Sequence, residues 1–215
     1  MSLNANSPNL NELSANQMRY LLYQEKKRRV QTRKLWTYFP DDGPYRRELY
    51  RKHLEFFEAG LLHRERLFMA GNRTGKTESA GGYEMTLHVT GLYPTWWKGR
   101  RFKKPVRAWA AGESSKDVRD TLQRKMLGDE GHYGTGLLPG DNIHRIVKRA
   151  GVPGAIDQVY VDHVSSSRKS ILTFKTYDQG RESFQADEID VVWFDEECPE
   201  DIYNEGLIRT MTTNG

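Results

Sequence analysis

The sequence is poor in the features that mark secreted and membrane proteins. Its 215 residues include one cysteine, Cys198, so the chain cannot form an internal disulfide or supply a thiolate zinc site. No apolar run approaches the roughly 18 residues of a membrane-spanning helix, and the N-terminus lacks the basic and then apolar pattern of a signal peptide. These absences predict a soluble protein of a reducing, intracellular compartment.

Hydrophobic residues are also scarce. They make up 37% of the chain and charged residues 29%, which predicts that much of the chain lies in exposed arms or loops. A chain of this length can still bury the core of one large domain. The formal net charge is +4 with the lysines and arginines clustered, a distribution that permits nucleic-acid binding without establishing it.

The N-terminal part differs in composition from the rest. Residues 1–16 are rich in Asn and Ser and predict a disordered tail, and residues 17–34 have the pattern of a helix with a strongly basic end. We therefore divide the chain into a flexible tail with a basic helix, residues 1–39, and a main domain, residues 40–215. The main domain opens with an amphipathic helix over residues 45–59.

Strand and helix patterns alternate along the main domain. Short apolar runs predict strands, longer amphipathic runs predict helices, and a stretch with five glycines, residues 128–140, predicts a loop. This alternation predicts an α/β fold with a mostly parallel sheet sandwiched by helices. The predicted elements are strands over residues 67–70, 106–111, 158–164, 170–176 and 189–194, with a hairpin joining the third and fourth, and helices over residues 78–89, over residues 115–127 and after Pro199.

A glycine-rich loop between strand 67–70 and the next helix predicts a phosphate site. In the Walker A pattern, backbone N–H groups surround a phosphate, a lysine reaches the β- and γ-phosphates, and Ser or Thr binds Mg²⁺. Gly75, Lys76 and Thr77 fill the last three positions, although the first glycine of the pattern falls on Ala70. The alternative is an ordinary glycine turn, but the helix N-terminus that follows favours an anion. The predicted nucleotide-binding residues are Gly71, Asn72, Arg73, Thr74, Gly75, Lys76 and Thr77.

An acidic motif further along the chain supplies the other groups that ATP hydrolysis needs. The apolar run 189–194 ends in Asp195, Glu196 and Glu197. Asp195 is the predicted Mg²⁺ ligand together with Thr77, and Glu196 is the predicted general base, with Glu197 as its competitor. The alternative is a helix N-terminus that carries acids for electrostatic reasons. The strand and helix between the two motifs favour the arrangement of RecA-like ATPases with a catalytic glutamate.

At these motifs the sequence resembles the large terminase subunit of tailed double-stranded DNA phages. The resemblance rests on residues 66–77 (RLFMAGNRTGKT), 54–57 (LEFF) and 192–197 (VWFDEE), and covers roughly residues 40–215. It implies a RecA-like P-loop ATPase domain that uses ATP and Mg²⁺ to move double-stranded DNA into a procapsid, in the cytoplasm of the infected bacterial host. It also implies a portal protein and a small terminase subunit as partners, and a homo-oligomeric ring when assembled.

Two departures from the family's pattern affect the site. The family often has an arginine four places before the Walker lysine; this chain has Asn72 there and Arg73 next to it, and Arg73 is the predicted sensor of the γ-phosphate. The family's adenine-reading glutamine is replaced at the nearest matching position by His53, whose imidazole cannot reproduce the paired amide contact. His53 is equally consistent with a helix residue half buried against the core.

A third departure concerns length, and it leaves other functions open. The family carries a nuclease domain after the ATPase, so we expect an ATPase domain truncated after the Walker B strand and its helix, and we assign no nuclease residue. A RecA-like helicase or remodelling ATPase is one alternative function. A scaffold that binds ATP without useful turnover is another.

Several basic and aromatic features have two interpretations each. The basic run 26–34 would either contact nucleic acid or form a solvated helix face. Trp96 and Trp97, with the cations at 98–104, would either contact nucleic acid or pack the end of the helix over residues 78–89. Arg181 is either a trans-acting arginine finger or an ordinary surface residue. Three histidines lack metal-ligand spacing and are predicted to be structural: His132, His144 and His163.

Overall fold

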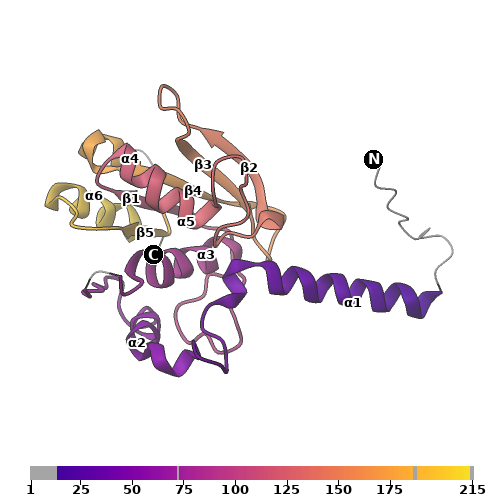
Figure 1. Cartoon of the computed structure of the whole chain (residues 1–215). Helices are drawn as coiled ribbons and strands as arrows, with labels where there is room; N and C mark the ends of the chain where they lie inside the picture. Colours follow the sequence, from indigo (N-terminus) through magenta and orange to yellow (C-terminus); the bar gives the residue numbers. More distant parts are fainter. Residues whose placement is uncertain (1–13, 72, 186–187, 214–215) are drawn as a thin grey trace.

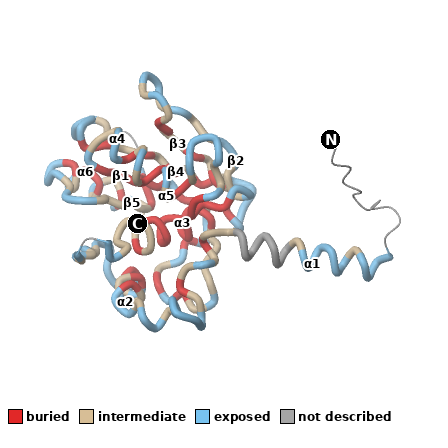
Figure 2. Tube along the Cα trace, viewed as in Figure 1, coloured by how far each residue is buried: buried red, intermediate tan, exposed pale blue. Residues whose placement is uncertain are grey.

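The computed structural model describes residues 14–71, 73–185 and 188–213, without the side chains of residues 26–32. Helix α1 (Ala15–Thr32) extends away from a body in which a sheet lies among helices (Figure 1). Buried residues concentrate in the sheet and in helix α3 (Tyr83–Thr90), whereas the described side chains of α1 are exposed or half-buried (Figure 2). None of the described helices is long and apolar enough to cross a membrane.

The predicted helices are present, several of them with irregular turns. The helix predicted over residues 45–59 is a 3₁₀ turn followed by an α-helix, and the helices predicted over residues 78–89 and 115–127 each contain a wide π-type section. The elements are η2 (Lys34–Thr37), η3 (Arg47–Tyr50), α2 (Arg51–Ala59), η4 (Lys76–Gly82), which continues into α3, then α4 (Ser115–Asp117), η5 (Val118–Gln123), α5 (Arg124–Leu127), η6 (Gly140–Asn142), η7 (Tyr177–Gln179), η8 (Arg181–Phe184) and α6 (Glu200–Met211).

The α/β class and the predicted hairpin between the third and fourth strands are confirmed, but the sheet is mixed, with two parallel and two antiparallel strand pairs. Its order is β2-β3-β4-β1-β5, with β1 parallel to both β4 and β5 and the other two pairs antiparallel. Short connections precede and follow β3, and such connections join antiparallel neighbours, whereas parallel neighbours need a crossover. The strands are β1 (Arg107–Gly112), β2 (Ile143–Lys148), β3 (Ile156–Asp162), β4 (Lys169–Thr176) and β5 (Val191–Phe194).

Strand β1 separates two hydrophobic cores because its side chains alternate between the faces of the sheet. Ala108 and Ala110 face a core shared with helices α3 and α5. Trp109 and Ala111 face a second core, to which helix α6 contributes Ile202. Since β1, β4 and β5 are parallel, their carboxyl ends meet at one edge of the sheet, the usual position of a ligand site in an α/β fold.

A third cluster is aromatic and packs beneath helix α3. Leu35 and Phe39 from the N-terminal segment join Phe57 of α2, and Tyr83 and Leu87 of α3, in this cluster. Trp97 completes it with only 3% of its surface exposed. The packing interpretation of Trp97 is therefore confirmed. Trp96 is half-buried, with the Arg47 guanidinium 5.1 Å from its ring centre.

Residues 67–70, predicted as a strand, are not part of the sheet. Leu67 and Met69 are 80% and 83% exposed. A strand needs a neighbouring ladder, and β5 pairs with β1 alone in the described part of the chain. The predicted arrangement, with both motifs on strands of one sheet, is thus absent from the described residues.

Candidate functional site

Gly75 gives the glycine-rich loop (residues 71–77) its tight turn into helix η4. Its φ is +88°, and its carbonyl accepts hydrogen bonds from the N–H groups of Ser79 and Ala80 at 2.8 and 3.2 Å. A Cβ here would lie 2.1 Å from Ser79 Oγ, so the position requires glycine. Arg73 is exposed, and its backbone is also in the left-handed conformation, with a φ of +63°. Asn72 lies outside the described residues.

The glycine-rich loop and the acidic motif meet beyond the end of β5. Thr77, in the first turn of η4, donates from Oγ1 to Asp195 Oδ2 at 3.3 Å, although the two residues are 118 positions apart. Asp195 directly follows β5, and its N–H donates to the carbonyl of Ala111 at 2.8 Å. Sheet pairing therefore fixes the position of Asp195, and the packing of η4 brings Thr77 to it.

Helix η4 can approach β5 because Gly81 has no side chain. A Cβ on Gly81 would lie 2.3 Å from the ring of Trp193 on β5, and one on Gly82 would lie 2.9 Å from Leu137. Considered from the sequence alone, these glycines are expected only to lower the stability of the helix that contains them. In the folded chain they permit the close contact on which the Thr77–Asp195 hydrogen bond depends.

The surroundings of Asp195 destabilise the charged form of its carboxyl group. Burial raises the pKa of Asp195, and the charge of Glu196 adds to that effect. The hydrogen bond from Thr77 and the positive charges of Lys125 and Lys76 act in the opposite direction. Nothing in the local sequence marks Lys125; it reaches the site because α5 packs against η4.

The predicted lysine and acidic residues line one groove of about 1060 Å³. The groove lies between residues 63–70 on one side and β5 with its following residues on the other. Glu196 and Glu197 are both exposed and both line it, so the structure does not select between them as the general base. Glu196 has a left-handed backbone at φ +63°.

His53 of α2 supports the glycine-rich loop. It is buried, its Nε2 lies 3.1 Å from Ser79 Oγ, and burial lowers the pKa of its imidazole. Its ring packs 5.0 Å from that of Phe68 and 5.8 Å from that of Phe39. The sequence places His53 at the position nearest to the family's adenine-reading glutamine, but it does not predict the contact with Ser79.

A buried polar network holds the segment that leads into the loop. Arg66 donates two hydrogen bonds to the carboxylate of Glu84 on α3, at 3.1 and 3.2 Å, and a third to the Phe56 carbonyl at 2.8 Å. Glu84 is 5% exposed and also contacts His88 Nε2 at 3.3 Å. The sequence predicts no role for any of these three residues, although Arg66 begins the segment 66–77 that carries the family resemblance.

The N-terminal segment also contacts the loop helix. Glu78, which follows Thr77, forms an ion pair with Lys34 and a hydrogen bond with Tyr38. Burial acts to raise the pKa of Glu78, but these two partners hold it below its ordinary value. The basic helix predicted at the N-terminus is therefore joined to the candidate site through the residues that follow α1.

Of the remaining predicted residues that the structure describes, Arg100 lines the groove and the others lie outside it. Arg181 forms an ion pair with the buried carboxylate of Glu205 at 3.0 Å. Lys98, Lys103 and Lys104 are exposed, and the side chains of residues 26–32 are outside the structural description. Among the described residues, no group of three or more His, Cys, Asp or Glu side chains could hold a metal ion.

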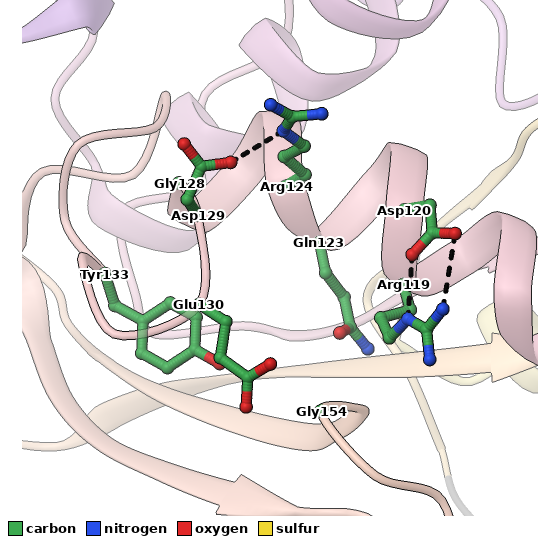
Figure 3. Close-up of a pocket in the computed structure, with 9 residues that line it drawn as sticks. All are labelled: Arg119, Asp120, Gln123, Arg124, Gly128, Asp129, Glu130, Tyr133 and Gly154. Atoms are coloured by element: carbon green, nitrogen blue, oxygen red, sulfur yellow. Dashed lines mark hydrogen bonds and ion pairs between the residues drawn. The ribbon is translucent and has the colours of Figure 1, made fainter.

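A second pocket, of about 230 Å³, lies beside η5 and α5 (Figure 3). Its arginines have acidic partners within it, since Arg119 pairs with Asp120 and Arg124 with Asp129. No predicted site residue lines this pocket. We therefore take the groove with Lys76 and Asp195 as the candidate functional site.

The side chains of Thr77, Asp195 and Lys76 together fit a magnesium nucleotide. Mg²⁺ in nucleotide sites is held by one or two protein oxygens together with phosphates and water. Thr77 Oγ1 and Asp195 Oδ2 converge as such oxygens, too few to form a dedicated metal site without a nucleotide. Lys76 and the start of η4 supply positive charge for phosphates.

Comparison with known proteins relates the chain to a phage family. The family model "Terminase large subunit, T4likevirus-type, N-terminal" matches residues 67–215. The large terminase subunit of Salmonella phage P22 is 40% identical over 182 residues, a match that covers 75% of this chain and 36% of the relative. The chain thus spans little more than a third of that relative's length. No solved structure matches the chain.

Proposed function

The chain belongs to the large terminase subunits of phages, and on that basis we propose that it is the ATPase domain of a viral DNA-packaging motor. The observation that carries the ATPase assignment is the meeting of Thr77 and Asp195 at 3.3 Å, with Lys76 lining the same groove. A phosphate-binding loop alone would support only nucleotide binding. A second carboxylate beside Asp195, in Glu196 or Glu197, supplies a base for hydrolysis.

In this proposal each residue of the site has one role. Backbone N–H groups of residues 71–77 and the Lys76 ammonium would bind the phosphates, and Thr77 and Asp195 would hold a Mg²⁺ ion, which would supply positive charge against the charge that develops in the transition state. Glu196 accepts a proton from the attacking water. Arg73, which is exposed, contacts the γ-phosphate in the transition state; Arg181 or another arginine would do so from a neighbouring subunit.

His53 contributes to nucleotide binding through the loop in this scheme. Its Nε2 contacts Ser79, whose hydroxyl also donates to the Gly75 carbonyl at 2.9 Å. The imidazole therefore stabilises the turn at Gly75. Such a contact sets the shape of the phosphate site and leaves adenine recognition to another group.

The partners and location follow from family membership and are part of the proposal. They are double-stranded DNA as the moved substrate, a portal protein and a small terminase subunit as assembly partners, and a homo-oligomeric ring when assembled. The site of action is the cytoplasm of the infected bacterium.

ATP hydrolysis by the chain, with and without double-stranded DNA, tests the assignment. We expect Mg²⁺-dependent turnover that Lys76→Ala abolishes and that Glu196→Gln lowers by about 10²- to 10⁴-fold. Glu182→Gln, an exposed acid outside the groove, is the matched control and should leave turnover unchanged.

The outcomes separate the candidate functions. Turnover that survives Lys76→Ala would contradict the proposal. Turnover that is insensitive to Glu196→Gln but lost in Glu197→Gln would change only the identity of the base. ATP binding that depends on Lys76 without turnover would favour a nucleotide-binding scaffold, and turnover coupled to strand separation would favour a helicase.

A further inference from the structure

One tyrosine hydroxyl joins the ends of three strands at the candidate site. Tyr177 is the first residue of η7, directly after β4, and is 7% exposed. Its hydroxyl lies 2.9 Å from the Asp195 carbonyl, just past β5, and 3.3 Å from the Ala111 carbonyl on β1. The Cys198 thiol also contacts this hydroxyl. A hydroxyl has one proton to donate, and of the two carbonyls the shorter distance assigns it to that of Asp195.

The tyrosine itself is held firmly. Thr176 and Gln179 cap the η7 turn through reciprocal side-chain hydrogen bonds, and the Asp178 N–H donates to the Glu113 carbonyl at 3.3 Å. Burial raises the pKa of the Tyr177 hydroxyl, so it stays protonated and remains a donor at neutral pH. The donor is therefore in a fixed position relative to the sheet.

The accepting carbonyl controls the backbone of the next residue. The Asp195 carbonyl belongs to the peptide group that joins Asp195 to Glu196, so its direction determines the φ of Glu196. That φ is +63°, a conformation that side chains with a Cβ seldom adopt. Left-handed residues persist where surrounding contacts enforce them. The Tyr177 hydrogen bond is a contact of this kind.

We propose that Tyr177 is a positioning residue for Glu196. Its hydroxyl fixes the Asp195–Glu196 peptide, and thereby keeps the Glu196 carboxylate on the groove that Lys76 and Asp195 line. Without the hydroxyl, the peptide can rotate and Glu196 can relax to a negative φ. The role in catalysis rests on the proposed ATPase function, whereas the backbone coupling does not.

Tyr177→Phe tests the catalytic part because it keeps the ring and removes only the hydroxyl. We expect kcat for ATP to fall about 10- to 100-fold, as for a catalytic group displaced by about 1 Å, with KM unchanged within about twofold. Adding Tyr177→Phe to Glu196→Gln should cause little further loss, since the first acts through the second.

The matched control is Tyr93→Phe. Tyr93 is half-buried, and its hydroxyl accepts a hydrogen bond from the Phe102 N–H at 2.8 Å and lies 2.9 Å from His88 Nδ1. Its loss should affect stability and leave kcat unchanged. An unchanged kcat in Tyr177→Phe, or a loss that multiplies with that of Glu196→Gln, would overturn the catalytic role.

A thermodynamic cycle tests the backbone coupling without any activity. Glycine is favoured at positive φ, so Glu196→Gly should raise the urea midpoint of the unmodified chain. In the Tyr177→Phe background the gain should vanish, because residue 196 is no longer held left-handed. Equal effects of Glu196→Gly in both backgrounds would overturn the proposal. Absence of Lys76-dependent hydrolysis would instead overturn the proposed function, and the cycle would still decide the coupling.

Discussion

The two sides of the groove are held in place by different means. The acidic side, Asp195 to Glu197, follows strand β5 and is anchored by backbone hydrogen bonds to β1 and by the Tyr177 hydroxyl. The loop side, residues 66–77, follows no strand, and side chains anchor it: Arg66 contacts Glu84, and His53 contacts Ser79 next to the loop.

This difference bears on how each side responds to substitution and to ligands. A sheet edge distributes its stability over many backbone hydrogen bonds, which most substitutions leave intact. A segment anchored by a few buried polar contacts loses much when one of them is broken. Such a segment also opens locally at lower cost, so we expect the loop side, more than the acidic side, to adjust when a nucleotide binds.

The largest expected effect is on the loop side, at the Arg66–Glu84 pair. Arg66→Ala leaves the carboxylate of Glu84, which is 5% exposed, without its main partner. Breaking a buried pair by removing one member typically costs about 3–5 kcal/mol, and urea unfolding should show a loss of that order.

An exposed ion pair on α2 provides the control for that measurement. Arg51 contacts Glu55 at 2.8 Å with 85% of its side chain accessible, so Arg51→Ala should cost less than about 1 kcal/mol. Similar losses in the two variants would show that the loop side does not depend on its buried network.

A smaller effect is expected where the two sides approach each other, at Gly81. In Gly81→Ala the new methyl group would lie 2.3 Å from the Trp193 ring, which forces η4 and β5 apart. Overpacking of this kind costs about 1–3 kcal/mol, partly offset by about 1 kcal/mol of helix propensity. Urea unfolding of Gly71→Ala gives the comparison, because its nearest neighbour would be 4.0 Å away. A Gly81→Ala variant more stable than the unmodified chain would contradict the close contact.

The same contrast explains how far the sequence predicted the molecule. The acidic side was predictable, since an apolar run of strand length ends at Asp195 and strand ends gather on one edge of a sheet. The contacts of the loop side were not, because Arg66 and Glu84, or His53 and Ser79, are brought together only by helix packing. The same apolar pattern gave a wrong prediction at residues 67–70, because no strand in the described part of the chain pairs with them. Strand β2 was missed because its side chains are mostly polar or only half-buried.

The smallest expected effect is a difference in the pH dependence of the two sides. Burial lowers the pKa of His53, so below the ordinary histidine value of about 6.5 the unfolded chain binds a proton that the folded chain resists. The free energy of unfolding should therefore fall as the pH drops from about 7.5 to 5.5. His53→Gln should reduce that slope by at most about 1.4 kcal/mol per pH unit. Burial also lowers the pKa of His163, so His163→Gln should reduce the slope in the same sense.

The acidic side should show the opposite sign at lower pH. Because burial raises the pKa of Asp195 above its ordinary value of 3.8, the folded chain holds the proton more tightly than the unfolded chain. The contribution of Asp195 to stability therefore decreases as the pH rises through that range.

Urea unfolding at several pH values, with exposed His132→Gln as the control, measures the histidine slopes. If His53→Gln and His132→Gln have the same slope, the neutral imidazole of His53 does not contribute to the stability of the loop side.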